Sequence, residues 1–293
     1  MLRKWSKTCL ILGLCVFVFA CDSEKGKEKP AVITAKTPLL SANYVGYYPH
    51  DVNAFTEGLF FHEGQLYEST GSPSDMPQTR SLFGIVDMTT GNIDVKAELN
   101  RNQYFGEGIT ILNGKLYQLT YQSREGFIYD AETFAQIGSF TIPTAEGWGM
   151  TTDGTNLIMS DGTNKLTYLD PSTLKPVRTV TVVENNTALE KLNELEYIDG
   201  YVYANVWLTN TIVKIDPTTG KVVGKLDFSA YANESKNING NSMEMNGIAY
   251  NPVTGTVLIT GKMWPKMYEL RISGIGPAQS KQATPPDTVQ TNP

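Results

Sequence analysis

The sequence predicts an all-β fold, a five-bladed β-propeller with four-stranded blades. Between the two ends of the chain, short segments rich in Tyr, Val, Ile, Leu and Phe alternate with Gly, Asn-Gly and Asp-Pro turns, without a helical period. A turn followed by an apolar strand also recurs five times, 40–55 residues apart, at Gly64, Gly114, Gly154, Gly200 and Gly255. A period of this size with about four strands per repeat is typical of propeller blades.

A second turn follows later in each of the first four repeats, at Asp87, Asp130, Asp170 and Asp216. We expect the inner strand A before the glycine turn, strand B after it, strand C ending at the aspartate, and strand D last. The aspartate side chains are expected to cap their own turns.

The fifth repeat runs out after its strand C, at residues 264–270. We therefore expect the segment 43–48, which precedes the first repeat, to serve as the outer strand of the fifth blade. This arrangement closes the ring and hides unpaired strand edges. Trp264 is expected to pack in the core against the closing strand.

The ends of the chain differ from the repeats in composition. Residues 1–21 combine a basic start, an apolar run from Leu10 to Phe19 that is too short to span a bilayer comfortably, and Cys21 after a small residue. This pattern predicts a signal peptide of the bacterial lipoprotein type. We expect lipidation of Cys21, export, and anchoring to a membrane facing the periplasm or cell exterior. Residues 22–42 are expected to form a flexible tether, residues 43–273 the propeller, and residues 274–293 a disordered tail.

The composition excludes several classes of site. All three cysteines lie within the first 21 residues, and the only histidines are His50 and His62. A cysteine nucleophile, a Ser-His-Asp triad and a His-rich zinc site are therefore not expected, and we predict no cofactor and no metal. The net charge of −6 argues against binding to nucleic acid. Chemistry in this domain has to use carboxylate, Lys, Asn, Tyr or Trp side chains.

The register of the repeats predicts which side chains meet at one mouth of the channel, where strand A begins and strand B ends. Nine residues before the strand B anchor, with two more in the last repeat, stand Glu57, Glu107, Trp148, Asn193 and Asn246. Five residues after the same anchor stand Gly71, Tyr121, Gly162, Trp207 and Lys262. Each repeat contributes a different polar or aromatic group, which indicates a pocket and not a structural repeat.

Several segments around these positions also resemble a known family, the glutaminyl-peptide cyclotransferases of the plant and bacterial type. The resemblance covers residues 54–270 and rests on blocks in the same order: Ala54–Leu59, Tyr104–Thr110, Glu146–Gly154, Leu192–Tyr197, Ala204–Trp207, Asn246–Tyr250 and Thr260–Pro265. It implies a metal-independent enzyme that converts the N-terminal glutamine of a peptide to pyroglutamate and releases ammonia. Its partners are then peptides or proteins with N-terminal glutamine, and we expect a monomer.

The resemblance also implies roles for the pocket residues. Glu107, which matches the glutamate of the Gly-Glu-Gly motif of the family, is expected to transfer the proton from the attacking amine to the leaving ammonia. Lys262 and Asn193 are candidates to bind the carboxamide oxygen as it gains charge. Trp148 and Trp207 are expected to enclose the glutamine side chain. Three further residues complete the expected substrate-binding set: Glu57, Tyr121 and Asn246.

Three features depart from the family pattern. Glu57 replaces a glutamine, Tyr121 replaces a tryptophan, and residues 71–80 replace a glycine-rich loop. A second carboxylate either holds the substrate ammonium more tightly or marks a changed substrate.

Two other classes of function remain open from the residues alone. One is a non-catalytic propeller that binds peptide ends or another small ligand at the same mouth. The other is a different propeller enzyme, either a glycosidase or lactonase using Glu57 and Glu107, or a metal-dependent lactonase in which Asn193 and Asn246 join them around a calcium-like ion.

Overall fold

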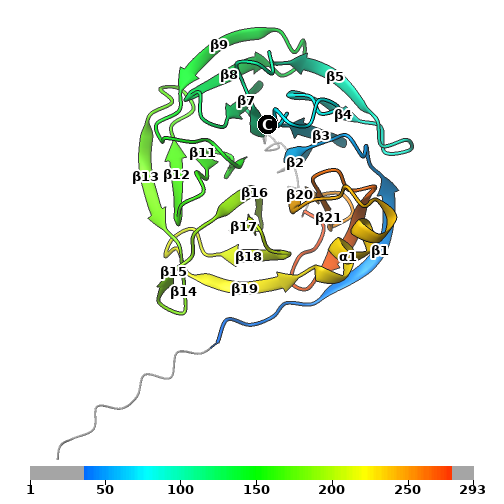
Figure 1. Cartoon of the computed structure of the whole chain (residues 1–293). Helices are drawn as coiled ribbons and strands as arrows, with labels where there is room; N and C mark the ends of the chain where they lie inside the picture. The colour runs from blue at the N-terminus through cyan, green and yellow to red at the C-terminus, as the bar shows by residue number, and fades with distance from the viewer. Residues whose placement is uncertain (1–35, 279–293) are drawn as a thin grey trace, which may run out of the picture. The chain divides into compact units, whose positions relative to one another are not determined.

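The computed structural model describes residues 36–278 and confirms the predicted propeller. Five four-stranded antiparallel sheets are arranged as blades around a central axis (Figure 1). The expected signal peptide with Cys21, the tether up to residue 35 and the tail from residue 279 lie outside the described residues.

The strands follow one another from the inside to the outside of each blade, in the predicted order A to D. Blade 1 contains β2 (Thr56–His62), β3 (Gln65–Thr70), β4 (Leu82–Val86) and β5 (Ile93–Glu98). Blade 2 contains β6 (Gly106–Leu112), β7 (Lys115–Thr120), β8 (Glu125–Asp130) and β9 (Gln136–Thr141). Blade 3 contains β10 (Met150–Thr152), β11 (Leu157–Met159), β12 (Lys165–Leu169) and β13 (Pro176–Thr181). Blade 4 contains β16 (Leu192–Ile198), β17 (Tyr201–Val206), β18 (Thr211–Ile215) and β19 (Val222–Asp227).

Blade 5 combines the two ends of the domain, as predicted. It contains β20 (Met245–Asn251), β21 (Thr256–Gly261), β22 (Lys266–Ile272) and, as its outer strand, β1 (Ala42–Pro49). β1 pairs with β22 in antiparallel register, with Tyr47 opposite Tyr268. The ring is therefore closed by hydrogen bonds between the first and last strands of the domain.

A buried ion pair follows directly after the closing strand. Nδ1 of His50 lies 2.7 Å from the carbonyl oxygen of Trp264, and Nε2 lies 2.9 Å from Oε1 of Glu68 on blade 1. Both ring nitrogens face acceptors, so the imidazolium form donates twice. Burial alone would lower the pKa of His50, but the adjacent Glu68 carboxylate outweighs it and raises that pKa. Trp264 itself is fully buried in the core of blades 4 and 5, as predicted.

The hydrophobic core consists of five clusters, and each cluster joins two neighbouring blades. Ile158 of blade 3 shares a cluster with Val202 of blade 4, for example, and Leu59 of blade 1 shares one with Leu258 of blade 5. Full burial of one such side chain contributes about 1.5–3 kcal/mol. The blades are thus held to one another by apolar contacts, which leaves the inner channel for polar side chains.

Two elements between the blades differ from the sequence prediction, which contained no regular helix. The helix α1 (Ser229–Ile238) connects β19 to β20, and a small hairpin of β14 (Val183–Glu184) and β15 (Thr187–Ala188) connects β13 to β16. The hairpin turn places Asn185 and Asn186 at positive φ, a conformation that asparagine tolerates. The aspartate turns are as predicted: the Asp130 carboxylate accepts a hydrogen bond from the backbone N–H of Thr133 at 2.8 Å.

Ordered contacts extend beyond the predicted domain boundaries of 43 and 273. The N–H of Leu40 donates to the carbonyl of Lys225 on β19 at 2.8 Å, and the N–H of Lys225 donates to Pro38 at 3.0 Å. At the other end, the N–H of Ala278 donates to the carbonyl of Pro252.

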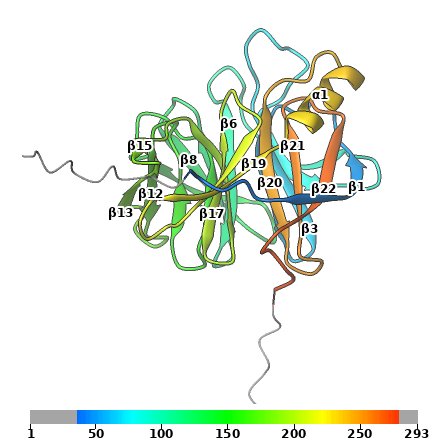
Figure 2. The ribbon, with the colours of Figure 1, turned by 90° about the horizontal axis from the view of Figure 1, so that it is seen from below.

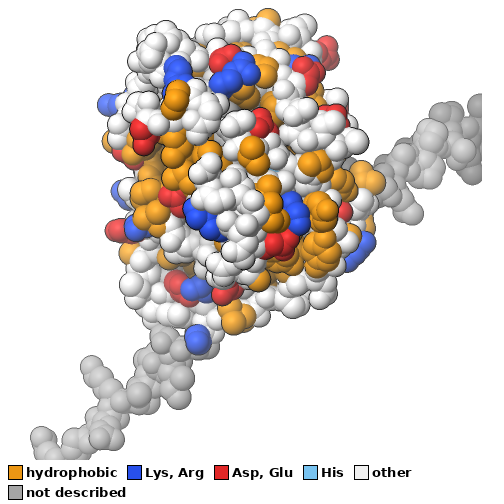
Figure 3. Space-filling model, turned by 45° about the vertical axis from the view of Figure 1, so that its right-hand side comes forward, with side chains coloured by type: hydrophobic (Ala, Val, Ile, Leu, Met, Phe, Trp, Pro, Cys, Tyr) orange, Lys and Arg blue, Asp and Glu red, His pale blue; other side chains and the backbone are white. Residues whose placement is uncertain are grey.

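Within residues 36–278, no helix has the length and apolar character needed to cross a bilayer. On the face shown in Figure 3, basic and acidic side chains are interspersed and form no single-sign patch.

Candidate active site

A cavity of about 310 Å³ lies at one mouth of the propeller, where the A strands begin and the B strands end. Figure 2 shows α1 and the loop between β3 and β4 rising on one side of the ring. All five blades contribute to the lining, which consists of Phe55, Glu57, Pro73, Phe105, Glu107, Tyr121, Trp148, Asn193, Trp207 and Lys262. Seven of the eight expected catalytic and substrate-binding residues are in this lining, and the eighth, Asn246, is not.

Three polar residues of the cavity, Glu57, Glu107 and Asn193, sit in irregular stretches of the A strands. The pairing of β2 with β3 shifts register between Thr56 and Gly58, around Glu57. The pairing of β6 with β7 shifts around Glu107, and that of β16 with β17 shifts around Asn193. A bulge bends a strand and re-aims the extra side chain. The same device in three blades therefore turns these side chains toward one cavity.

Glu57 is clamped from both sides. Its Oε1 lies 2.8 Å from Nζ of Lys262, and its Oε2 accepts a hydrogen bond from Nδ2 of Asn246 at 3.0 Å. Burial raises the pKa of Glu57 to about 7, while Lys262 and Asn246 oppose that rise. Burial alone would lower the pKa of Lys262, but Glu57 and Glu107 outweigh it and raise that pKa, so the ammonium stays charged.

Glu107 is buried, with 5% of its surface exposed, and it lines the cavity. Among residues 36–278, no side chain or backbone group makes a hydrogen bond to its carboxylate, whereas its backbone carbonyl accepts one from Ser69 Oγ at 2.6 Å. Burial and then the nearby Glu57 carboxylate raise the pKa of Glu107 well above its ordinary value, against the opposing charge of Lys262. A carboxyl group with a raised pKa and an open face is suited to accept and return a proton near neutral pH.

Five aromatic rings form a continuous wall from the charged end of the cavity to the opposite side. Successive ring centroids lie 5.9 Å apart for Phe55 and Phe105, 6.0 Å for Phe105 and Tyr121, 6.5 Å for Tyr121 and Trp148, and 5.4 Å for Trp148 and Trp207. Nζ of Lys262 lies 4.5 Å from the centroid of Phe55. Such a wall excludes water and attracts cationic groups through the faces of the rings.

Two glycines leave room for this wall, at the register positions where the other blades place side chains. A Cβ on Gly71 would lie 2.1 Å from the ring of Phe105, and a Cβ on Gly162 would lie 2.6 Å from the ring of Trp148. Gly162 also has a φ of +76°, which disfavours other residues. The absence of a pocket side chain in blades 1 and 3 at this position is thus required by the aromatic wall.

Two neutral residues complete the far side of the cavity. Asn193 is 3% exposed and lines the cavity, and its Oδ1 is buried and has no partner within the described part of the chain. An amide carries both an acceptor and a donor, so its Nδ2 can donate to a ligand in the cavity. The indole Nε1 of Trp148 donates to Oε2 of Glu146 at 2.9 Å, which fixes the orientation of the ring.

Known proteins resemble this chain in sequence and in fold. Residues 14–272 match the family model described as glutamine cyclotransferase. The chain belongs to the glutamine cyclotransferase family. It is 35% identical over 265 residues to a glutaminyl-peptide cyclotransferase of Arabidopsis thaliana, covering 90% of this chain and 81% of the relative. The fold is similar to the crystal structure of Myxococcus xanthus glutaminyl cyclase, with a TM-score of 0.72 and 31% identity over 81% of this chain and 98% of that chain.

One expected substrate-binding residue of this glutamine cyclotransferase does not line the cavity. Asn246 is 1% exposed and lies behind Glu57, where its Nδ2 donates to Glu57 and to the carbonyl of Thr56, both at 3.0 Å. β20 shifts register between Met245 and Ile248 as β2, β6 and β16 do, so it is the hydrogen bonds to Glu57 and Thr56 that distinguish Asn246 from the residues that line the cavity. Its place is to orient Glu57, not to contact a ligand.

Three lining residues were not among the predicted site residues: Phe55, Phe105 and Pro73. A signal for two of them exists, because Phe55 and Phe105 stand two residues before Glu57 and Glu107, directly ahead of the equivalent strands β2 and β6. Pro73 lies in a loop that has no counterpart of similar length in the other blades, so register alone does not reach it.

The metal-dependent lactonase alternative does not suit this site. Of its four expected ligands, Asn246 does not line the cavity and donates its Nδ2 to Glu57. The ammonium of Lys262 also lies where a cation bound by Glu57 would have to sit. A buried positive charge at 2.8 Å from the proposed ligand opposes the binding of a second cation.

Proposed function

We propose that this glutamine cyclotransferase converts the N-terminal glutamine of peptides to pyroglutamate, with Glu107 as the general base and then the general acid. The observation that supports Glu107 in this role is its buried carboxylate, which lines the cavity and lacks a hydrogen-bond partner among the described residues. The other buried carboxylate of the cavity, Glu57, is already bound by Lys262 and Asn246.

The reaction needs no external reactant. The neutral α-amine of the substrate attacks the carbon of its own γ-carboxamide, and a five-membered ring with a tetrahedral oxyanion forms. Glu107 accepts the proton that the amine loses and delivers it to the departing nitrogen, so ammonia leaves and the carboxylate is restored. A raised pKa suits both halves of this transfer, because the group must hold a proton briefly at neutral pH.

The neighbouring donors and rings support this chemistry. Asn193 and Lys262 line the cavity, and we propose that Nδ2 of Asn193 and Nζ of Lys262 bind the oxyanion; each such donor is worth about 3 kcal/mol where water is excluded. Trp148 and Trp207, with ring planes 82° apart, are proposed to hold the glutamine side chain. Holding the amine and carbonyl together lowers the entropic part of the barrier.

Glu57 is proposed to act through its neighbours. Each of its oxygens already accepts one hydrogen bond, from Lys262 and from Asn246, so it holds the ammonium of Lys262 at the cavity. Its charge also raises the pKa of Glu107. The replacement of a glutamine by Glu57 therefore changes the proton balance of the site more than its shape.

The activity is tested by incubating the purified propeller, with chelator present, with a peptide that begins with glutamine. We expect ammonia release and the loss of one ammonia in the mass spectrum, at a rate well above spontaneous cyclisation. A peptide that begins with asparagine serves as the matched control for side-chain length. No turnover above the spontaneous rate would refute the proposal, and activity that returns only when metal is added would favour a metal-dependent propeller enzyme.

For the N-terminal segment we propose export and lipid anchoring at Cys21, to a bacterial membrane facing the periplasm or exterior. The support is the basic start, the short apolar run and the polar stretch after Cys21. Replacement of Cys21 by Ser should move the protein from the membrane fraction to the soluble fraction.

We also propose that the protein acts as a monomer, since one chain supplies the whole lining of the cavity. Light scattering at the concentration of the assay tests this.

A further inference from the structure

The connection between β3 and β4, residues 71–81, is the longest of the five B-to-C connections, and we call it the blade-1 loop. The equivalent connections in the other blades are less than half as long: 121–124, 160–164, 207–210 and 262–265. All five lie at the mouth that contains the cavity. The blade-1 loop therefore forms a wall on one side of the mouth that blades 2 to 4 lack.

A single arginine from outside the blade-1 loop holds it. Nη1 of Arg101 donates to the carbonyls of Pro77 and Thr79, both at 3.0 Å. Nη2 of Arg101 donates to the carbonyls of Pro73 at 3.1 Å and Met76 at 3.3 Å. The planar guanidinium presents its donors in a fixed fork, so it fixes the path of the loop at four points.

Both segments joined by this contact, the blade-1 loop and the connection that carries Arg101, also supply residues that line the cavity. The first bonded carbonyl belongs to Pro73, which lines the cavity. Arg101 lies in the connection from β5 to β6, which continues into Phe105 and Glu107. The ring of Phe105 in turn packs where Gly71, at the base of the loop, has no side chain.

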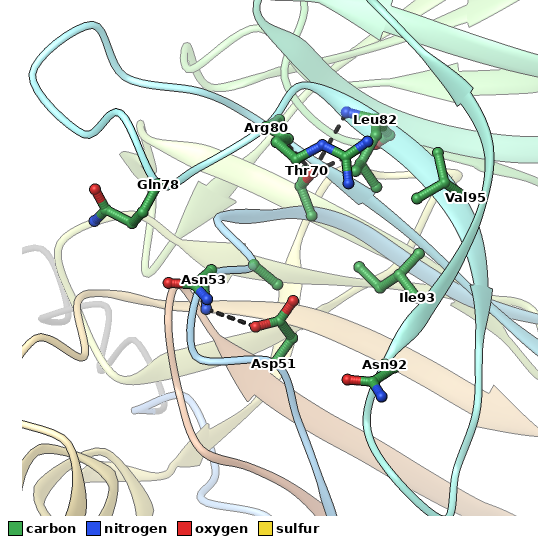
Figure 4. Close-up of a pocket in the computed structure, with 10 residues that line it drawn as sticks. Asp51, Asn53, Thr70, Gln78, Arg80, Leu82, Asn92, Ile93 and Val95 are labelled. Carbon is green, nitrogen blue, oxygen red and sulfur yellow. Dashed lines mark hydrogen bonds between the residues drawn. The ribbon is translucent and has the colours of Figure 1, made fainter.

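Packing from the outer side does not fix the blade-1 loop in the same way. A second cavity of about 230 Å³ borders it there, lined in part by Gln78 and Arg80 (Figure 4). The guanidinium of Arg80 bonds away from the loop, with Nε 2.9 Å from Oε1 of Glu98 on β5. Arg80 thereby ties the end of the loop to β5, whereas the middle of the loop, residues 73–79, has a cavity on each side and is held from outside the loop by Arg101.

We propose that the blade-1 loop contacts the residue that follows the N-terminal glutamine, and that Arg101 is a positioning residue for this contact. The proposal rests on the proposed function. Glu107 and Asn193 lie at the buried end of the cavity, so the glutamine side chain has to fill its depth. The rest of the peptide is joined only through the carbonyl of glutamine and has to leave through the mouth, where Pro73 is half-buried. The ring of Pro73 offers apolar surface without a donor, which favours an apolar or aromatic second residue.

The test compares two substrates, glutamine amide, which has no second side chain, and the tripeptide Gln-Phe-Ala. We expect Arg101→Gln to raise KM for the tripeptide about tenfold, the scale of a modest misplacement of a binding group. The kcat for both substrates and KM for glutamine amide should stay within about twofold. Arg80→Gln is the matched control. It also removes a guanidinium, but one that belongs to the blade-1 loop and faces away from the active-site cavity, so this variant should behave as wild type.

A second variant keeps the test independent of folding. Pro73→Ala leaves Arg101 intact and should raise KM for Gln-Phe-Ala several-fold more than it raises KM for glutamine amide. If both variants affect glutamine amide as much as the tripeptide, or affect neither, the loop does not bind the second residue and the proposal is overturned. If the wild-type protein releases ammonia from neither substrate, it is the proposed function that fails.

Discussion

The two sides of the cavity differ in charge. Blades 5, 1 and 2 supply the ionisable groups Lys262, Glu57 and Glu107, whereas blades 3 and 4 supply the neutral groups Trp148, Asn193 and Trp207. Proton transfer and the binding of the glutamine side chain are thus assigned to opposite sides of the channel. Variants on the charged side should change the pH dependence of the reaction, and variants on the neutral side should leave it unmoved.

The largest effect is expected at the centre of the charged side. Glu107→Gln preserves the shape of the side chain but removes its ability to transfer a proton, so kcat/KM should fall by about 10²–10⁴-fold. Steady-state ammonia release measures this, with thermal unfolding to show an intact fold. Glu132→Gln, at an exposed turn of the same blade, is the matched control and should be silent. Full activity of the Glu107 variant would show that another group moves the proton.

On the neutral side, Asn193→Ala should lower kcat by about 10²-fold, because an oxyanion donor is lost from a site that excludes water. The two limbs of the pH–rate profile should stay where they are, since Asn193 does not titrate. A shift of either limb would show that the two sides are not separate in the way proposed.

Trp207→Ala should raise KM about tenfold, since a cation–π and stacking contact of this kind is worth about 1–2 kcal/mol. The effect on kcat should be small, and Trp207→Phe should restore most of the affinity because it retains an aromatic face. A variant that loses kcat while KM stays constant would place Trp207 in the transition state and not in substrate binding.

The smallest change in rate, and the sharpest in pH dependence, is expected from Glu57→Gln. The Glu57 carboxylate raises the pKa of Glu107, so its removal lowers that pKa, and the uncompensated charge of Lys262 lowers it further. Because Glu107 acts first as a base, kcat/KM should then persist to lower pH than in the wild type. A pH–rate profile from acid to neutral pH measures the shift, and an acid limb that stays or moves upward contradicts it.

Most of the fold could be predicted because the blade signal is local. Each glycine turn and each aspartate turn lies within a few residues of the strands it connects, so five repeats and one leftover strand sufficed for the ring. α1 was missed because the stretch from Ser229 to Ile238 has little apolar periodicity and a single buried residue, Ser235. The helix depends on its position between two blades, and the local sequence does not reveal that position.

The candidate site could be predicted as far as register determines it. Equivalent strand positions brought Glu57, Glu107 and Lys262 to one mouth, because blades share the same path. The position of Asn246 behind Glu57 depends on partners from another blade, the Glu57 carboxylate and the carbonyl of Thr56, which register does not reveal. Arg101 was missed as well, since its four acceptors lie in a loop that follows a different strand.

Because the ring is closed between its first and last blades, the active site contains groups from both ends of the domain. Glu57 follows the first strand of the domain, and Lys262 precedes the last, yet their side chains meet at 2.8 Å in the cavity. A nascent chain that has not reached residue 262 lacks the ammonium that binds Glu57, so this pair forms only after the last blade is present. Activity is therefore expected to appear in a single late step of biosynthesis. A turnover assay on a refolding chain would measure when the first and last blades come together.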